Sequence, residues 1–168
     1  MVGLIMGHGR TTLYSAAPGR KGVDLNRCWS AGFSPMYDDR NYTGSEAFLG
    51  YESRYLRDFL ISKKSTNGQT LLVDLHGWTT QLIGDSGMAS YYGKEFTKNI
   101  YTSSYGRGYL INWARTSLGS PGKPARALLV ELPEYGNNGK KIMSHEDVLA
   151  SGYSGKFIQA TLNMLKGI

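Results

Sequence analysis

Apolar residues recur at helical spacing in two long segments of the chain. Over residues 45–63 they fall on one helical face behind Ser45, a residue type that caps helix N-termini, so a helix is predicted there. Farther along, Ser144 and Asp147 form a capping-box pattern, and apolar residues between 157 and 165 mark one face of a terminal helix. Two shorter helices are predicted around 94–101 and over 108–118.

Short, largely apolar runs predict strands between these helices. The runs 71–75 and 126–132 are smooth and brief enough for buried strands, and 79–83 and 2–6 are two further candidates. Buried strands that alternate with helices are typical of an α/β fold. A length of 168 residues without an internal repeat predicts a single domain, 1–168.

The composition agrees with one globular unit and argues against a membrane partner. Hydrophobic residues make up 40% of the chain, enough for a sizeable core, at a mean hydropathy of -0.34. No apolar run approaches the roughly 20 residues of a membrane span. The first residues also lack the pattern of a signal peptide, so neither an anchor nor a leader is expected.

The charge balance is basic, with 19 Lys+Arg against 13 Asp+Glu and a net charge of +6. Such a surface is compatible with nucleic acid, an anionic cell-wall polymer or an acidic peptide. The basic residues occur singly or in pairs and form no recognised motif, so a nucleic-acid partner is not expected. The single cysteine, Cys28, cannot form an internal disulfide and is expected to be a buried structural thiol, which leaves the redox compartment open.

Two titratable residues lie at the carboxyl ends of the two buried strands, where α/β folds gather functional groups. His76 follows the strand 71–75, and Glu131 lies near the end of the strand 126–132. An ionised carboxylate beside a core strand is costly unless it is paired or used, so Glu131 is a candidate functional residue. A lone histidine in such a place is commonly structural, so both interpretations stay open for His76.

Four segments, taken in order, resemble the zinc metallocarboxypeptidases of the carboxypeptidase A/B type. GVDLNRCW (22–29) resembles that family's D-x-N-R-N-W segment, and RNYTGSEAFLGYESRYLRDF (40–59) resembles the stretch that leads into its next helix. VDLHGW (73–78) is similar to the strand with a zinc-binding histidine, and LLVELPEYG (128–136) to the strand with the catalytic glutamate. The resemblance covers almost the whole chain and implies a three-layer α/β/α fold with a central mixed sheet.

By this resemblance, Asn26 and Arg27 bind the terminal carboxylate of a substrate, and Asp24 orients their turn. The chemistry is suitable, because a guanidinium presents a planar fork to a carboxylate and an amide adds a neutral donor. The alternative is a solvated loop with an Asp–Arg ion pair. The family's mobile tyrosine corresponds to Tyr105 in preference to Tyr109.

The resemblance also implies the reacting groups. His76 corresponds to the third zinc ligand, and Glu131 to the general base that takes a proton from zinc-bound water and passes it to the leaving amine. The arginine that polarises the scissile carbonyl corresponds to Arg10, with Arg20 as the alternative.

The sequence departs from the family in one motif. The family's first two zinc ligands come from H-x-x-E, upstream of D-x-N-R, and no H-x-x-E occurs here. A catalytic zinc needs three protein ligands, so we expect an incomplete zinc site in a domain that lacks its N-terminal part. His8 is a weak substitute, and His145, after a helix cap, is expected on the surface. A truncation, a second chain or self-association that covers the missing elements, and a degenerate homologue all stay open.

The implied function is zinc-dependent hydrolysis of a peptide bond adjacent to a free carboxylate, with the isolated chain expected to be inactive. The substrate is an ordinary peptide C-terminus or a peptidoglycan stem peptide, and the basic surface favours the wall. The alternative from another class is a catalytically dead module that binds carboxylates or peptides. An extracellular or wall-associated place follows only for a bacterial chain that is secreted as a longer precursor.

Overall fold

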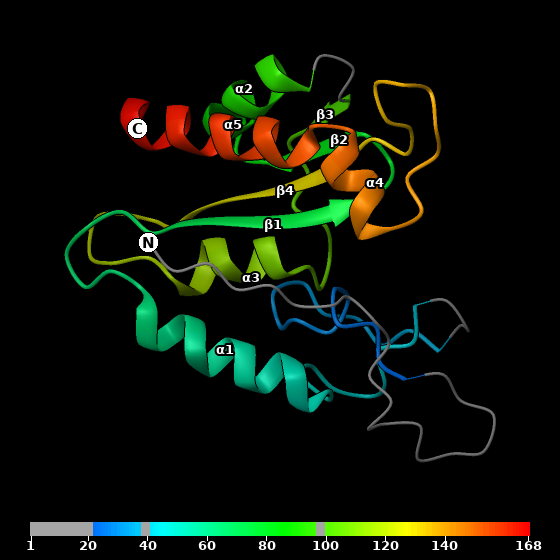
Figure 1. Cartoon of the computed structure of the whole chain (residues 1–168). Helices are drawn as coiled ribbons and strands as arrows, with labels where there is room; N and C mark the ends of the chain where they lie inside the picture. The colour runs from blue at the N-terminus through cyan, green and yellow to red at the C-terminus, as the bar shows by residue number, and fades with distance from the viewer. Residues whose placement is uncertain (1–21, 38–40, 97–99) are drawn as a thin grey trace. The chain divides into compact units, whose positions relative to one another are not determined.

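One mixed sheet contains all the strands of the described residues. The computed structural model of the chain describes residues 22–37, 41–96 and 100–168. Its strands are β1 (Leu71–Gly77), β2 (Gln81–Gly84), β3 (Ile100–Thr102) and β4 (Arg126–Leu132), in the order β1-β4-β2-β3 (Figure 1). β1 is parallel to β4, β4 is antiparallel to β2, and β2 is parallel to β3. The predicted α/β class with a mixed sheet is therefore confirmed.

β4 has an inner position in the sheet, and its sequence RALLVEL suits that position. A near-continuous apolar run is typical of an inner strand, since such a strand has little contact with water. The predicted bounds of β4 are correct, whereas β1 extends to Gly77 and β2 lies at 81–84 rather than 79–83. The fully buried residues of β4 are Ala127, Leu128, Leu129 and Val130.

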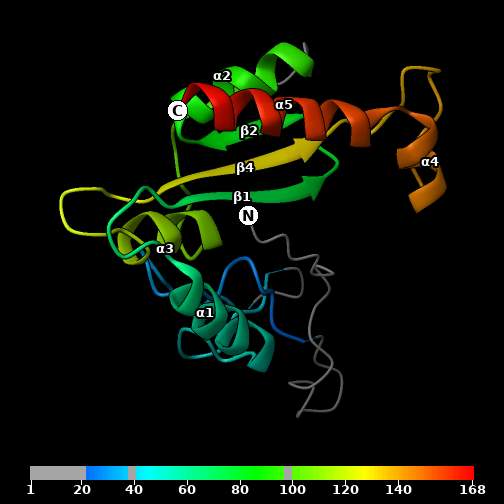
Figure 2. The same cartoon turned by 60° about the vertical axis from the view of Figure 1, so that its left-hand side comes forward.

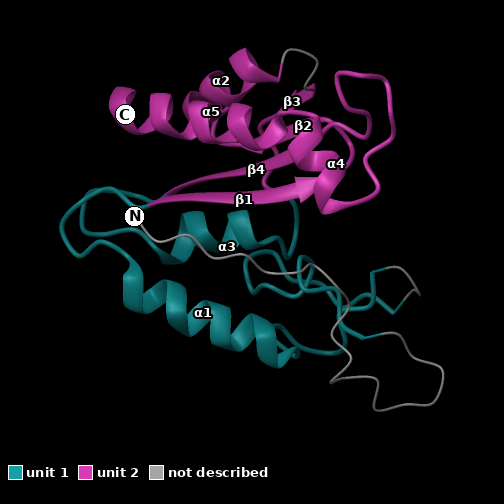
Figure 3. Ribbon diagram, viewed as in Figure 1, with its two compact units in different colours: residues 1–70, 106–125 teal, residues 71–105, 126–168 magenta. Residues whose placement is uncertain are grey.

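The chain divides into two compact units that alternate along the sequence (Figure 3). Unit 1 comprises residues 1–70 and 106–125 and contains α1 (Tyr51–Lys63) and α3 (Leu110–Ser117). Unit 2 comprises residues 71–105 and 126–168 and contains the sheet with α2 (Ser86–Glu95), α4 (His145–Ala150) and α5 (Tyr153–Gly167). This division into two units is finer than the single domain that the sequence predicts. The single domain stays a prediction. The third layer of the fold and the missing N-terminal part also stay predictions. The strand predicted at 2–6 lies outside the described residues.

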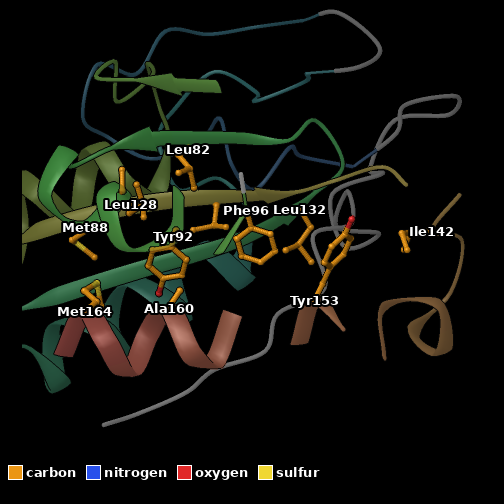
Figure 4. Close-up of a cluster of buried hydrophobic side chains, with 12 residues drawn as sticks. Leu82, Met88, Tyr92, Phe96, Leu128, Leu132, Ile142, Tyr153, Ala160 and Met164 are labelled. Atoms are coloured by element: carbon orange, nitrogen blue, oxygen red, sulfur yellow. The ribbon is translucent and has the colours of Figure 1, made fainter. Parts of the chain in front are cut away.

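In unit 2, α2 and α5 pack against each other on one face of the sheet (Figure 2). Tyr92 of α2 is fully buried, and its hydroxyl forms a 2.8 Å hydrogen bond with Thr161 Oγ1 of α5. The rings of Phe96 and Tyr153 pack edge to face with their centroids 5.7 Å apart. Other members of this core, which supports β4 and β2, are Leu82, Met88, Leu128, Leu132, Ile142, Ala160 and Met164 (Figure 4).

The first predicted helix begins later than its sequence pattern indicates. α1 begins at Tyr51 behind Gly50, so the predicted cap at Ser45 is wrong. Phe48 adopts a positive φ of 59°, which a right-handed helix cannot include. The Phe48 ring packs edge to face against the Trp29 ring, with the centroids 5.4 Å apart. The helical spacing of apolar residues does not predict this contact, because the two residues are distant in sequence.

The other helices show where periodicity is sufficient. The short helix predicted at 108–118 is confirmed as α3, and the capping box of Ser144 and Asp147 is confirmed at the start of α4. The predicted terminal helix is divided into α4 and α5 at Gly152, whose φ is 74°. The helix predicted around 94–101 is wrong, because α2 ends at Glu95 and a strand follows. None of the described helices has both the length and the apolar content that a membrane crossing requires.

Asp85 joins the start of α2 to the start of β4. Its Oδ1 atom caps α2 by accepting the Met88 N–H over 2.8 Å. The same carboxylate forms a two-point ion pair with Arg126, at 2.7 Å from Nη2 to Oδ1 and 3.0 Å from Nε to Oδ2. The hydrogen bonds from Arg126 are the main reason that the pKa of Asp85 is lowered from its usual value.

We therefore expect acid to destabilise the protein through Asp85. A carboxyl with a lowered pKa in the folded state stabilises the fold above its unfolded pKa, and this contribution disappears as the pH falls through the lower, folded pKa. In urea unfolding, the free energy of unfolding of the parent should fall below about pH 4. Asp85→Asn keeps a capping oxygen but loses the charge, so it should be less stable at pH 7 and show a smaller fall. An equal fall in both proteins would contradict this role of Asp85.

Candidate functional site

His76 and Glu131 lie side by side at the carboxyl ends of β1 and β4. The two strands are parallel, and the Cα atoms of His76 and Glu131 are partners in the register. Side chains alternate between the two faces of a strand, and partners on neighbouring strands share a face. The topology therefore places the two predicted reacting residues, which are distant in sequence, next to each other in unit 2.

Asp74 orients the His76 ring. It precedes His76 by two positions on β1 and therefore lies on the same face of the strand. His76 Nε2 lies 3.0 Å from Asp74 Oδ2, and the two side chains are 13% and 6% exposed, respectively. Asp74 was not predicted as a site residue, although its position two residues before His76 on a strand was a usable signal.

The described residues do not fit a catalytic zinc site by themselves. His76 supplies one imidazole. The Asp74 carboxylate contacts Nε2 of that imidazole and is not placed as a second metal ligand. In the part of the chain that the structure describes, no group of three or more His, Cys, Asp or Glu side chains is placed to hold a metal ion. A catalytic zinc needs three protein ligands. His145 is exposed, as predicted, and the candidates His8, Arg10 and Arg20 lie outside the described residues.

Residues 24–27 form a hydrogen-bonded turn in unit 1. The Asp24 side chain accepts the Asn26 N–H over 2.9 Å, and the Asp24 carbonyl accepts the Arg27 N–H over 3.1 Å, so Asp24 orients the turn. Asn26 Oδ1 accepts the Leu110 N–H at the start of α3 over 3.0 Å, which fixes Nδ2 as the donor end of the amide. Asn26 is only 6% exposed, so the alternative of a solvated loop is wrong.

Arg27 is held from two sides. Its Nη1 donates to the Asn26 carbonyl over 3.0 Å, and its guanidinium carbon lies 4.1 Å from the centroid of the Tyr109 ring. A guanidinium over an aromatic face forms a favourable cation–π contact. The tyrosine beside Arg27 is therefore Tyr109, the less favoured candidate of the sequence. The preferred candidate, Tyr105, belongs to unit 2, where its ring lies next to Gly84.

Aromatic packing supports the turn from the interior of unit 1. Trp29 Nε1 donates to the Leu25 carbonyl over 2.8 Å. The centroids of the Trp29 and Trp113 rings are 4.8 Å apart. Cys28 is fully buried, and burial raises the pKa of its thiol to about 11. The thiol is therefore neutral at pH 7, which confirms the expectation of a buried structural cysteine.

The chain matches one long protein over a short part of that protein. No protein-family model matches it. Bacteriocin BCN5 of Clostridium perfringens is 37% identical over 164 residues, which are 96% of this chain but only 16% of the bacteriocin. The similarity is therefore to one segment of a much longer protein.

Among solved structures, carboxypeptidase A from Helicoverpa armigera is similar to this chain. The TM-score is 0.64 and the identity 19%, over 92% of this chain and 44% of the carboxypeptidase. At this identity the likeness shows the fold, and the chain has a carboxypeptidase-like fold, as the sequence motifs imply. The roles of Asn26, Arg27, His76 and Glu131 stay predictions.

Proposed function

We propose that the chain forms a peptidase-like domain that binds a peptide by its free carboxylate and hydrolyses the adjacent peptide bond. The observation that carries this proposal is the turn of Asn26 and Arg27, which we call the carboxylate receptor. Its backbone and side chains are held by hydrogen bonds and a cation–π contact before any ligand arrives. A preset receptor loses little conformational entropy on binding, so more of the interaction energy appears as affinity. The carboxypeptidase-like fold supports the same interpretation.

The donors of the receptor suit a carboxylate. The guanidinium of Arg27 offers paired N–H groups that match the two oxygens of the anion, and the fixed Nδ2 of Asn26 is a neutral donor on the neighbouring residue. Because Asn26 is buried and Arg27 is partly buried, hydrogen bonds to the anion compete less with water than bonds at an open surface.

Glu131 and His76 are the proposed reacting residues. As general base, Glu131 would take a proton from the attacking water and return it to the leaving amine. The Asp74 carboxylate lies 3.0 Å from His76 Nε2 and would help to orient an imidazole that binds zinc. We propose that any further zinc ligands come from residues outside the described ones or from a second chain. Among the described strands β1 lies at an edge of the sheet, where a further strand can pair.

The proposed substrate is a stem peptide of the bacterial cell wall. Bacteriocin BCN5 is by its name a protein that acts on bacteria, and stem peptides offer free carboxylates to a protein that reaches the wall. The net charge of +6 is suited to an anionic wall polymer. With this substrate the protein would act outside the cell that makes it.

The second candidate function is a module that binds carboxylates without cleaving. It is favoured by one observation, namely that the described residues include no group of three metal-binding side chains. Both candidates use the same receptor, so binding alone does not separate them. Only the peptidase would release the residue next to the scissile bond, so an assay for this product distinguishes the two functions.

A titration with matched peptides tests the proposal. The probes are acetyl-L-Ala-γ-D-Glu-L-Lys and the ordinary tripeptide acetyl-L-Ala-L-Ala-L-Lys, each with free and with amidated carboxyl groups. We expect the free forms to bind at least about tenfold more tightly than the amidated ones, as the loss of one charge-assisted hydrogen bond predicts. We also expect the stem peptide to bind more tightly than the ordinary one. Equal affinity for free and amidated forms would refute the carboxylate receptor.

We further predict that the isolated chain retains little zinc. With His76 as its one identified ligand, the coordination free energy of a three-ligand site is not available. After exhaustive dialysis, elemental analysis should find much less than one zinc per chain, and His76→Ala should leave that small amount unchanged. One tightly retained zinc per parent chain that is lost in His76→Ala would contradict this prediction.

A further inference from the structure

We infer that Tyr109 is a positioning residue of the carboxylate receptor: its ring holds the Arg27 guanidinium so that the Nε–Nη2 edge meets the ligand. The inference rests on the proposed function and deepens it. It assigns to Tyr109 a role for its ring face, whereas a mobile tyrosine would act through its hydroxyl group.

The Tyr109 ring is fixed by the loop that precedes it. Gly106 has a φ of 69° and lies so close to the ring that a Cβ at this position would collide with it. Gly108 joins the same loop to residues 29–31, which follow the carboxylate receptor in sequence. Its N–H donates to the Ala31 carbonyl and its carbonyl accepts the Trp29 N–H, both over 3.0 Å. Close packing of this kind prevents the ring from moving alone. Tyr109 is therefore a fixed platform beneath Arg27.

The contacts of Arg27 leave one edge of the guanidinium for a ligand. One face lies over the Tyr109 ring, and Nη1 donates to the Asn26 carbonyl. Within the described residues, neither Nε nor Nη2 of Arg27 donates a hydrogen bond to the protein. These two nitrogens form an edge with two parallel N–H groups, which is the geometry that a two-oxygen anion accepts. Stacking on Tyr109 holds the plane of this edge, so the carboxylate must approach in that plane.

Two substitutions distinguish the contribution of the Tyr109 ring from that of its hydroxyl group. Tyr109→Phe keeps the ring face beneath Arg27 and removes the hydroxyl, whereas Tyr109→Leu keeps an apolar side chain and removes the ring. If the ring positions Arg27, we expect binding of free acetyl-L-Ala-L-Ala-L-Lys to change less than about twofold in the Phe variant. The Leu variant should bind about 3- to 10-fold more weakly, the range expected for a partly buried cation–π contact.

A second measurement reports the stacking without any ligand. In proton NMR, the side-chain resonances of Arg27 should be shifted upfield by the ring current of Tyr109 in the parent and in Tyr109→Phe. The shift should be absent in Tyr109→Leu. Tyr55→Leu is the matched control, because Tyr55 is 72% exposed on α1 in the same unit, and it should change neither affinity nor the Arg27 resonances.

Each outcome gives a decision. A Phe variant as weak as the Leu variant would show that the hydroxyl acts, and would overturn the inference. Unchanged affinity in Tyr109→Leu, together with loss of the ring-current shift, would also overturn it while the proposed function stands. A parent that binds free and amidated peptides equally would refute the proposed function itself, whatever the Arg27 resonances show.

Discussion

Arg27→Lys should weaken the binding of a peptide with a free C-terminal carboxylate by about 10- to 150-fold. Lysine keeps the positive charge but loses the planar two-point match, and a charge-assisted hydrogen bond contributes about 1.5 to 3 kcal/mol net. Lysine also loses the guanidinium plane that stacks on Tyr109. The measurement is a calorimetric titration with acetyl-L-Ala-L-Ala-L-Lys as the free acid.

The same titration with the amidated peptide gives the decisive comparison. Amidation removes the anion from the ligand, so it should weaken binding to the parent and change binding to Arg27→Lys very little, because the interaction is already lost. Arg57→Lys is the matched control, since Arg57 also lies over an aromatic ring, that of Phe48, and pairs with Asp58 outside the receptor turn. If the effects of amidation and of Arg27→Lys simply add, Arg27 does not bind the carboxylate.

Gly108→Ala should destabilise the protein by about 2 to 5 kcal/mol, as a strained φ and a steric clash together predict. Gly108 has a φ of 69°, a conformation that alanine adopts only with strain, and its new Cβ would collide with the carbonyl oxygen of Arg27. The colliding atom belongs to the backbone, so no side-chain rotation relieves the clash. Urea unfolding measures the loss, and carboxylate binding by the fraction that still folds should also be weaker, because the Arg27 turn must move.

Gly122→Ala separates the clash from the backbone strain. Gly122 has a nearly identical φ of 70°, but a Cβ there would meet no atom within 4 Å. We expect it to cost about 1 to 2 kcal/mol, the strain alone. Equal losses in the two variants would contradict a clash between the added Cβ at position 108 and the Arg27 carbonyl oxygen.

Some elements of the fold follow directly from local patterns in the sequence. The strand 126–132 was predictable residue by residue, because a near-continuous apolar run at an inner sheet position satisfies local propensity and burial together. The capping box at Ser144 was predictable for a similar reason, since the two hydrogen bonds that define it join neighbouring residues. The helix predicted around 94–101 failed, because that segment is short and has no strong periodicity.

The candidate site was predictable as residue types and much less as contacts. Asn26, Arg27, His76 and Glu131 could be named because their segments resemble motifs of the metallocarboxypeptidases, and the side chains suit the predicted roles. Asp74 was not named, although its spacing to His76 on a strand was a usable signal, and Tyr109 was named only as the less favoured tyrosine. Their importance comes from the partner that each one touches.

The amino-acid pattern alone therefore determined the α/β class, the inner strand and the identity of the candidate reacting residues, since each depends on residues close together in the chain. Tertiary folding determined that His76 and Glu131 are neighbours, because the register of β1 and β4 joins two distant segments. It likewise placed Tyr109 beneath Arg27 through contacts between two loops of unit 1 that are far apart in sequence. Contacts of this kind have no period in the sequence, because their energy depends on how whole elements pack against one another.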